Sequence, residues 1–385
     1  MSGDASFSRE FRETGGRSAV KVQVGLEAGE ETVATVGAVV VTHDGGERVL
    51  ACLAALARQT VRPVEILVVD NGSKDGTPRR VRAAFPAVRV LELPVNLGPG
   101  AARNLGLAAV RGELVLWVDH DIYLEPDALE RMLAARVRMP AEVVLPRIRL
   151  HPERDVVQCD GGAPHVVGTL LLRHGFTPLG AIGEHGAAYV DAAPSGCMLV
   201  ERRVIEAVGG FDESFFFYLE DLELSLRLRL MGYRILCEPA AVAFHDRGRG
   251  SALAFRGEGP YPRERAFLLM RNRLRIVATH FATGTILALL PTLLAYEAAS
   301  LVLSLLHGWG RDWWAAWTSL FAHRRALAAR RRWIQARRRL PDRALLVDGP
   351  LPIAPGLLRS TLQRRLVEVL GLFAAGNWWV ARRLV

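Results

Sequence analysis

The chain has 385 residues, of which 50% are hydrophobic and 23% charged, and its net charge is +9 at pH 7. This is enough for a full hydrophobic core in one large or two modest domains. Its four cysteines (Cys52, Cys159, Cys197 and Cys237) are too far apart in sequence for a Cys-x-x-Cys site, which argues against a zinc site and a disulfide framework. The first residues lack a basic stretch followed by an apolar one, so we expect no signal peptide and a cytoplasmic protein.

After a polar stretch, apolar runs alternate with amphipathic segments along the chain. We expect residues 1–33 to form a flexible arm, with a short strand at 20–24. Strands that alternate with helices of 10–15 residues indicate an α/β fold with a mainly parallel, doubly wound sheet. The first four expected strands are residues 36–42, 64–69, 88–93 and 113–118, and short strands are expected further along at 143–145 and 166–172.

Polar side chains follow the apolar strands at the points where these end. Ligands of open α/β sheets bind at this carboxyl edge. Asp119 and Asp121 directly follow the fourth strand, and two close carboxylates repel each other unless a cation lies between them. Mg²⁺ is bound in this way, by one or two carboxylates together with substrate phosphates. The sequence therefore predicts a metal site at the end of this strand.

Two common nucleotide-binding motifs are missing from the expected turns. The turn after the first strand is His43-Asp44-Gly45-Gly46, whereas a dinucleotide-binding turn has Gly-x-Gly-x-x-Gly. The chain also lacks the Gly-x-x-x-x-Gly-Lys-Ser/Thr pattern of a P-loop. Both of these classes are therefore disfavoured.

Four successive motifs resemble those of family 2 glycosyltransferases. The resemblance covers about residues 35–280 and implies a GT-A fold, a nucleotide-sugar donor and an inverting transfer. It also implies that Asp119 and Asp121 flank the metal and the ribose-diphosphate. The motifs are Val39-Val40-Val41-Thr42-His43, Ile66-Leu67-Val68-Val69-Asp70-Asn71-Gly72-Ser73, Asn96-Leu97-Gly98 with Ala102-Arg103-Asn104, and Asp119-His120-Asp121.

The same resemblance implies roles for residues that bind the donor. It places Thr42 and Asp70 at the nucleobase and Asp44 near the nucleoside, and it places Arg103 along the donor site. A metal held by a carboxylate and both phosphates would stabilise the negative charge that grows on the departing nucleoside diphosphate. The second requirement of the reaction is a base that accepts the proton of the acceptor hydroxyl.

A candidate base lies at the start of a helix expected from residue 220 to the stop at Gly232. Alternating leucines in this stretch would also fit a strand, but the i,i+4 pair Glu223–Arg227 favours a helix. Glu220 and Asp221 then occupy its first turn, where acids also complement the helix dipole. The motif Gly-Gly-Phe-Asp-Glu-Ser before them again resembles family 2. That resemblance implies that Asp221 is the base and that Glu220 orients acceptor hydroxyls.

A histidine follows a further short strand expected at residues 241–244. A single histidine such as His245 is often structural, but histidine with carboxylate also suits a divalent transition ion such as Mn²⁺. The family resemblance places a histidine that contacts metal or diphosphate here. We therefore expect His245 to join Asp119 and Asp121 at a site for Mg²⁺ or Mn²⁺.

The last third of the chain is both apolar and basic. Residues 281–306 are almost entirely apolar apart from Glu297, but arginines on both flanks oppose a single membrane pass. We expect a hairpin or a pair of interfacial helices that breaks at Pro291. Four tryptophans between 309 and 317, the arginine run at 324–339 and an amphipathic helix at 361–385 suit a membrane surface. A buried helical subdomain or a dimer interface is the alternative.

These observations predict three regions and one function. The regions are an arm (1–33), a GT-A domain with a donor half (34–125) and an acceptor half (126–260), and a membrane-associating helical region (261–385). The pattern Phe-x-x-x-x-Glu-Asp, together with Arg271-Asn272-Arg273 before the apolar tail, is similar to bacterial rhamnosyl-, galactofuranosyl- and mannosyltransferases of surface polysaccharides. We expect transfer from a nucleoside-diphosphate sugar, with deoxythymidine or uridine ahead of guanosine, to a lipid-linked or cell-surface glycan at the inner face of the cell membrane.

The paired carboxylates and the positive net charge also fit two other functions. A metal-dependent nucleotidyltransferase also uses paired carboxylates, but no basic glycine-rich loop follows the first strand. A basic protein that binds nucleic acid or membrane without catalysis would fit the net charge of +9. Apart from Trp333, however, no aromatic residues are interleaved with the arginines of the basic run, so nucleic acid is not an expected partner.

Overall fold

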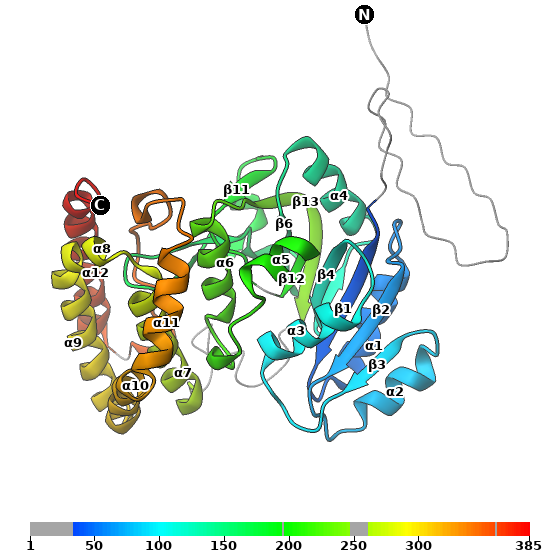
Figure 1. Ribbon diagram of the computed structural model, residues 1–385, viewed down its shortest axis with the longest axis horizontal. Coiled ribbons are helices and arrows are strands. Elements are labelled where there is room, and N and C mark those ends of the chain that lie inside the picture. The colour runs from blue at the N-terminus through cyan, green and yellow to red at the C-terminus, as the bar shows by residue number, and fades with distance from the viewer. Residues whose placement is uncertain (1–33, 195, 247–260, 359) are drawn as a thin grey trace, which may run out of the picture.

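The computed structural model describes residues 34–194, 196–246, 261–358 and 360–385. The strand predicted at residues 20–24 lies outside these ranges. A large sheet with helices on its faces occupies one side of the molecule, and the C-terminal helices gather on the other side (Figure 1).

The first four strands form the parallel sheet that the sequence predicts. Their register is continuous: β1 pairs with β2 on one side and with β4 on the other, and β3 follows β2. Every residue of β1 is buried, which explains its unbroken apolar and β-branched sequence. The elements are β1 (Val36–Thr42), α1 (Gly46–Ala57), β2 (Glu65–Asp70), α2 (Thr77–Ala84), β3 (Arg89–Glu92), α3 (Pro99–Ala109) and β4 (Leu114–Asp119).

The rest of the sheet is mixed, so the prediction of a mainly parallel sheet holds only for β1 to β4. Strand β12 lies between β4 and β6 and runs antiparallel to both, while β13 is parallel to β6. No helix separates β6 from β7 along the chain, and these two strands pair antiparallel. The elements are β5 (Ile122–Leu124), α4 (Ala128–Arg138), β6 (Val143–His151), β7 (Val156–Cys159), β8 (Gly162–Pro164), β9 (Leu170–Leu172), β10 (Thr177–Pro178), β11 (Ala188–Val190), β12 (Cys197–Glu201), α5 (Arg202–Val208) and β13 (Ile235–Asp246).

Three strands of this half differ from their predicted bounds. Strands β6 and β13 are much longer than the short strands predicted at 143–145 and 241–244, and they pair along most of their length. The stretch 166–172 is the turn and second strand of the β8–β9 hairpin, not one strand. Gly168 causes this difference, because its φ of +82° is a turn conformation that an extended strand excludes.

Helix α6 (Glu220–Leu230) confirms the helix predicted from the leucine-rich stretch. It is buried on nearly all sides, which explains why its apolar residues do not follow a helical stripe. The predicted pair is also present: Arg227 Nε donates to Glu223 Oε1 over 2.8 Å, and both side chains are fully buried. His280 and Arg330 also lie within 3.3 Å of the Glu223 carboxylate, so the buried charge is well compensated.

The C-terminal region consists of helices that pack on α6 and on one another. The predicted break at Pro291 is present: one helix ends at Ala288, and Pro291 lies in the first turn of the next. Within the described residues, no helix has the combined length and apolarity that a membrane crossing requires. The helices are α7 (Arg263–His280), α8 (Thr283–Ala288), α9 (Leu290–Leu306), α10 (Gly310–Ala322), α11 (Arg324–Gln335) and α12 (Thr361–Ala381).

Two charged features of this region have structural partners that the sequence does not reveal. Glu297, the acid in the apolar stretch, forms an ion pair with Arg273 and accepts a hydrogen bond from Trp317 Nε1 over 2.9 Å. In the arginine run, Arg331 donates to the carbonyls of Ala278 and Phe281 at the end of α7. Part of the run therefore fastens α11 to α7.

Candidate functional site

The ends of β1, β2 and β4 bring the predicted donor residues together. Thr42 pairs in register with Asp70, and its neighbour Val41 pairs with Asp119. Thr42 and Asp70 are buried, and Asp70 Oδ2 accepts a hydrogen bond from the backbone N–H of Ser73 over 3.1 Å. The carboxyl edge that the alternating pattern predicts is therefore present, with its polar side chains side by side.

Asp44 joins the loops that follow β1 and β2. Its backbone N–H donates to Ser73 Oγ over 2.8 Å, and its carboxylate accepts from the backbone N–H of Lys74 over 2.7 Å. Asp44 has a φ of +49°, and unlike Thr42 and Asp70 its side chain is exposed. The residue lies at the outer rim of the strand-end site.

Arg103 connects the strand ends to the predicted catalytic helix. Its Nη2 lies 2.5 Å from Asp119 Oδ1, its Nη1 lies 3.9 Å from Glu220 Oε1, and its side chain is only 1% exposed. Burial raises the pKa of Asp119, and the charge of Arg103 opposes that rise. Because α3 carries Arg103 in its first turns, the Asn-Leu-Gly motif before α3 positions a cation between two acidic groups.

Gly98 lets the donor half approach the catalytic helix closely. Its φ is +85°, and a Cβ atom at this position would lie 2.2 Å from the backbone oxygen of Phe216. A larger residue would therefore push apart the two segments that carry Arg103 and Glu220.

The structure also brings Asp121 and His245 together. Strand β5 pairs antiparallel with β13, and this pairing leaves His245 Nε2 3.4 Å from Asp121 Oδ2. Burial opposes ionisation of Asp121, but the charge and hydrogen bond of His245 outweigh it and lower the pKa of Asp121 to about 2. Asp121 is therefore a carboxylate at any physiological pH.

Gln158 on β7 fixes the orientation of His245, and the sequence gives no signal for it. Its Oε1 lies 2.8 Å from His245 Nδ1, and an amide oxygen can only accept a hydrogen bond, so Nδ1 carries a proton. The Nε2 atom then faces Asp121 with either a second proton or a lone pair. Metal-binding histidines are commonly oriented by such an acceptor at the ring nitrogen that does not bind the metal.

Glu220 and Asp221 begin α6 after a backbone segment of unusual conformation. Phe216, Tyr218 and Leu219 all have a φ between +62° and +65°, which costs energy for residues other than glycine. Asn272 of α7, fully buried, donates through Nδ2 to the carbonyl oxygens of Phe215 (3.0 Å), Phe217 (3.0 Å) and Tyr218 (2.7 Å). Helix α7 thus stabilises the strained backbone segment that leads to the predicted catalytic pair.

A cavity of about 920 Å³ joins these groups. Arg103 and Asp119 line it from the donor half, and Glu220, Asp221 and His245 line it from the other half. Burial, followed by the charge of Asp221, raises the pKa of Glu220. Glu220 therefore keeps its proton to a higher pH than an ordinary glutamate does.

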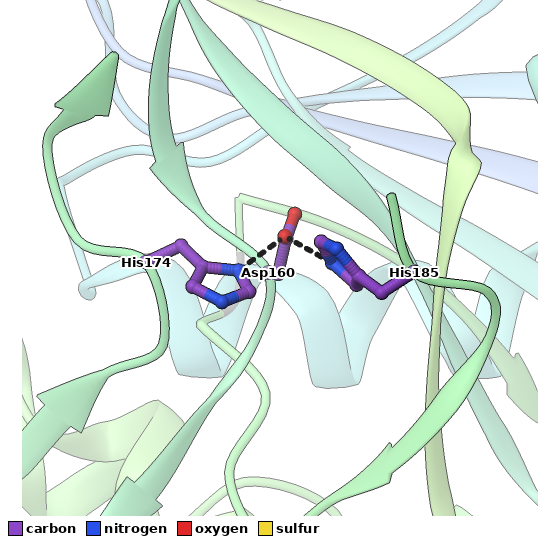
Figure 2. Close-up of side chains that lie close together, drawn as sticks. All are labelled: Asp160, His174 and His185. Carbon is purple, nitrogen blue, oxygen red and sulfur yellow. Dashed lines mark hydrogen bonds and ion pairs between the residues drawn. The ribbon is translucent and has the colours of Figure 1, made fainter. Parts of the chain in front are cut away.

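Asp160, His174 and His185 form a second cluster that the sequence analysis did not single out (Figure 2). Each offers one ligand atom, and these atoms lie within 4.8 Å of one another, so the group has the composition of a metal site. Arg147, however, donates to both Asp160 oxygens over 2.8 and 2.7 Å. This guanidinium already supplies the positive charge that a metal would bring, and a metal ion would have to displace it.

Comparisons with known proteins agree with this geometry. Residues 38–158 match the family described as glycosyl transferase family 2. The chain is 32% identical over 235 residues to an N-acetylglucosaminyl-diphospho-decaprenol L-rhamnosyltransferase of Mycobacterium tuberculosis. The match covers 55% of this chain and 76% of the relative. It is 30% identical over 218 residues to the succinoglycan biosynthesis protein ExoO of Rhizobium meliloti, with 55% and 61% covered.

A solved structure has a similar fold. The crystal structure of GalNAc-T7 with UDP, GalNAc and Mn²⁺ superposes with a TM-score of 0.53 at 16% identity, and the match covers 74% of this chain and 55% of that one. The mixed sheet thus has a fold of the GT-A type. The chain belongs to glycosyltransferase family 2.

Proposed function

We propose that this glycosyltransferase moves a sugar from a nucleoside-diphosphate sugar to a hydroxyl of a lipid-linked glycan, with inversion at the anomeric carbon. The observation that carries this proposal is the shared cavity, in which the start of α6 faces the end of β4. Donor-side groups (Arg103 and Asp119) and acid groups suited to an acceptor (Glu220 and Asp221) line the same space. A single displacement needs these two sets on either side of the reacting carbon.

Asp221 is our proposed base. Burial raises the pKa of Glu220, so Glu220 is better suited to donate a hydrogen bond than to accept a proton from the acceptor. Asp221 lies beside it in the first turn of α6 and lines the same cavity. In this assignment Asp221 accepts the proton of the attacking hydroxyl, and Glu220 holds a neighbouring hydroxyl of the acceptor sugar.

Asp121 and His245 fit a divalent cation. A carboxylate with a pKa of about 2 faces an imidazole nitrogen 3.4 Å away, and Gln158 holds the other nitrogen of that imidazole. Carboxylate and imidazole together suit Mn²⁺, and a carboxylate with phosphate oxygens suits Mg²⁺. Bound there, the ion would neutralise the charge of the departing diphosphate. Asp119 is held by Arg103 and would act on the donor through that pair.

The acceptor and donor classes rest on the relatives. The Mycobacterium tuberculosis relative is named for transfer of L-rhamnose to a sugar carried by diphospho-decaprenol. A lipid-linked sugar as acceptor would therefore suit this chain. The donor that we propose is a deoxythymidine- or uridine-diphosphate sugar, and this choice rests on the sequence motifs. Thr42 and Asp70, buried at the strand ends, are the proposed contacts to the nucleobase, with Asp44 near the nucleoside.

The test is a screen of nucleoside-diphosphate sugars with N-acetylglucosaminyl-diphospho-lipid acceptors, with Mn²⁺ or Mg²⁺ present. We expect release of a nucleoside diphosphate, and a product whose anomeric configuration is opposite to that of the donor by NMR. Release of pyrophosphate instead would indicate nucleotidyl transfer. Retained configuration would reject the single displacement.

We also propose that helices α9 and α12, which pack together, rest on an anionic bilayer surface. Large apolar side chains are exposed along both helices, and contiguous patches of this kind mark interaction surfaces. Exposed arginines such as Arg324, Arg325 and Arg332 on α11, which packs against α7 and α10, would meet the lipid headgroups. The exposed apolar residues are Leu294, Val302 and Leu305 on α9, and Leu362, Leu366 and Leu372 on α12.

Vesicle sedimentation tests this surface. The protein should sediment with phosphatidylglycerol vesicles more than with phosphatidylcholine, and 1 M salt should release part of it, since electrostatic reach falls to ~3 Å. Leu372→Gln should weaken binding at least about tenfold through lost apolar burial. Leu105→Gln, at an exposed leucine of α3, is the matched control and should bind normally. Equal losses in both variants, or no sedimentation at all, would reject the surface.

A further inference from the structure

The cavity that holds Glu220 and Asp221 extends well beyond them. Arg103, Asp119 and His245 line its polar end. The nucleoside residues that we propose, Thr42 and Asp70, lie outside its wall. A volume of about 920 Å³ lies near the upper end of the range for small-molecule sites. We therefore assign the part of the cavity beyond Glu220 and Asp221 to the acceptor and not to the donor.

The far end of the cavity is apolar and is built by C-terminal elements. Leu269 and Met270 of α7, Leu303 of α9, and Ile353 and Leu357 after α11 line it. Ser300, Ser304 and His307 also line the cavity, but most side chains contributed by these elements are apolar and suit hydrocarbon. The space is thus suited to the apolar part of an acceptor and not to further glycan units.

A buried cation also lines the cavity. Arg265 of α7 is 7% exposed and lines the cavity, and its guanidinium carbon lies 4.9 Å from the ring centre of Tyr218 and 5.2 Å from that of Tyr261. An arginine oriented by two rings presents a planar set of donors, which matches the oxygens of a diphosphate.

Helix α9 connects the apolar end to the outside of the molecule. Ala299 and Leu303 line the cavity, while Val302 and Leu305 of the same helix are exposed. Helix α9 thus carries both a part of the cavity lining and a part of the apolar face that we propose to rest on the bilayer. A hydrocarbon chain held in the cavity could pass along α9 to the membrane without crossing a polar surface.

From these four observations we infer that the cavity binds the isoprenoid chain of a lipid-diphosphate acceptor, with the diphosphate at Arg265 and the first sugar at Asp221. This inference rests on the proposed function, since it takes Asp221 as the end at which the acceptor reacts. To the proposed function it adds where the lipid chain of the acceptor binds and which residues recognise that chain. The wall formed by α7, α9 and residues 352–357 would set the preference for an acceptor with a hydrocarbon chain over a free sugar diphosphate.

Two diphosphates of different chain length test the site. Farnesyl diphosphate, with ten more carbons than isopentenyl diphosphate, should bind the full-length protein at least about 100-fold more tightly by calorimetry, because the added carbons leave water. Inorganic diphosphate measures the head group alone. Equal affinity for all three probes would overturn the inference.

A matched pair of variants locates the chain. Ala299→Trp fills the apolar end and should remove most of the difference between the two isoprenoid probes, whereas Ala298→Trp, at the exposed neighbouring position, should leave it intact. Equal effects of both variants would indicate nonspecific partitioning and would also overturn it. Nucleotide-sugar hydrolysis, measured separately, reports on the proposed function: lost hydrolysis with normal chain-length dependence would reject that function and not the lipid site.

Discussion

Replacing Asp221 with asparagine is expected to lower the rate of sugar transfer by ~10²–10⁴-fold, the usual cost of losing a general base. Asparagine keeps the size of the side chain but cannot accept the proton of the acceptor hydroxyl. Binding of the nucleotide-sugar should change little, because Arg103 and the strand-end residues remain. The measurement is the initial rate at saturating donor and acceptor, with donor affinity determined by calorimetry on the same protein.

Glu220→Gln is the matched variant one position earlier. A neutral amide resembles the protonated carboxyl that burial favours at this position, so it should mainly raise the acceptor KM. If Glu220→Gln instead loses more turnover than Asp221→Asn, the base is Glu220. Normal turnover of Asp221→Asn would remove Asp221 from the role proposed here.

Asp121→Ala should abolish metal-dependent transfer and leave the fold intact. This residue supplies the carboxylate that faces His245, and the alanine variant leaves one imidazole as the remaining ligand of that pair. Gln158→Leu should have a graded effect: it keeps both ligands but releases the imidazole, and loss of such a partner typically costs 10–100-fold in metal affinity. Mn²⁺ binding followed by electron paramagnetic resonance, without donor or acceptor, measures both effects directly.

His174→Ala separates this site from the Asp160 cluster. We expect it to bind Mn²⁺ normally, because Arg147 already occupies both oxygens of Asp160. If Mn²⁺ binding survives Asp121→Ala and disappears in His174→Ala, the metal belongs to Asp160, His174 and His185. Circular dichroism spectra would check that each variant remains folded.

Local patterns were sufficient to predict the donor half of the fold. Parallel strands buried on both faces have continuous apolar sequences, and the polar residues that end them, such as Thr42, Asp70 and Asp119, fall at one edge by geometry. Helix α6 was also predictable, because the i,i+4 spacing of Glu223 and Arg227 favours a helix. Residue spacing along the chain carries this information.

Contacts between distant segments were not predictable in the same way. Gln158 reaches His245 across 87 positions, and Asn272 reaches Tyr218 across 54. No pattern in the sequence indicates which distant residue either amide contacts. The antiparallel insertion of β12 between β4 and β6 is similarly a property of pairing partners, and an isolated strand sequence does not specify its neighbours.

The core behind α6 has a mechanical consequence for the enzyme. Leu222 and Leu226 of α6 belong to the same buried cluster as Ala374 and Trp378 of α12. The helix that carries Glu220 and Asp221 thus shares a hydrophobic core with the C-terminal helices. A shift of α12 against a lipid surface would reach the first turn of α6 through this cluster. If the protein rests on a bilayer as proposed, its height and tilt there would influence the orientation of the two carboxylates that we propose for catalysis.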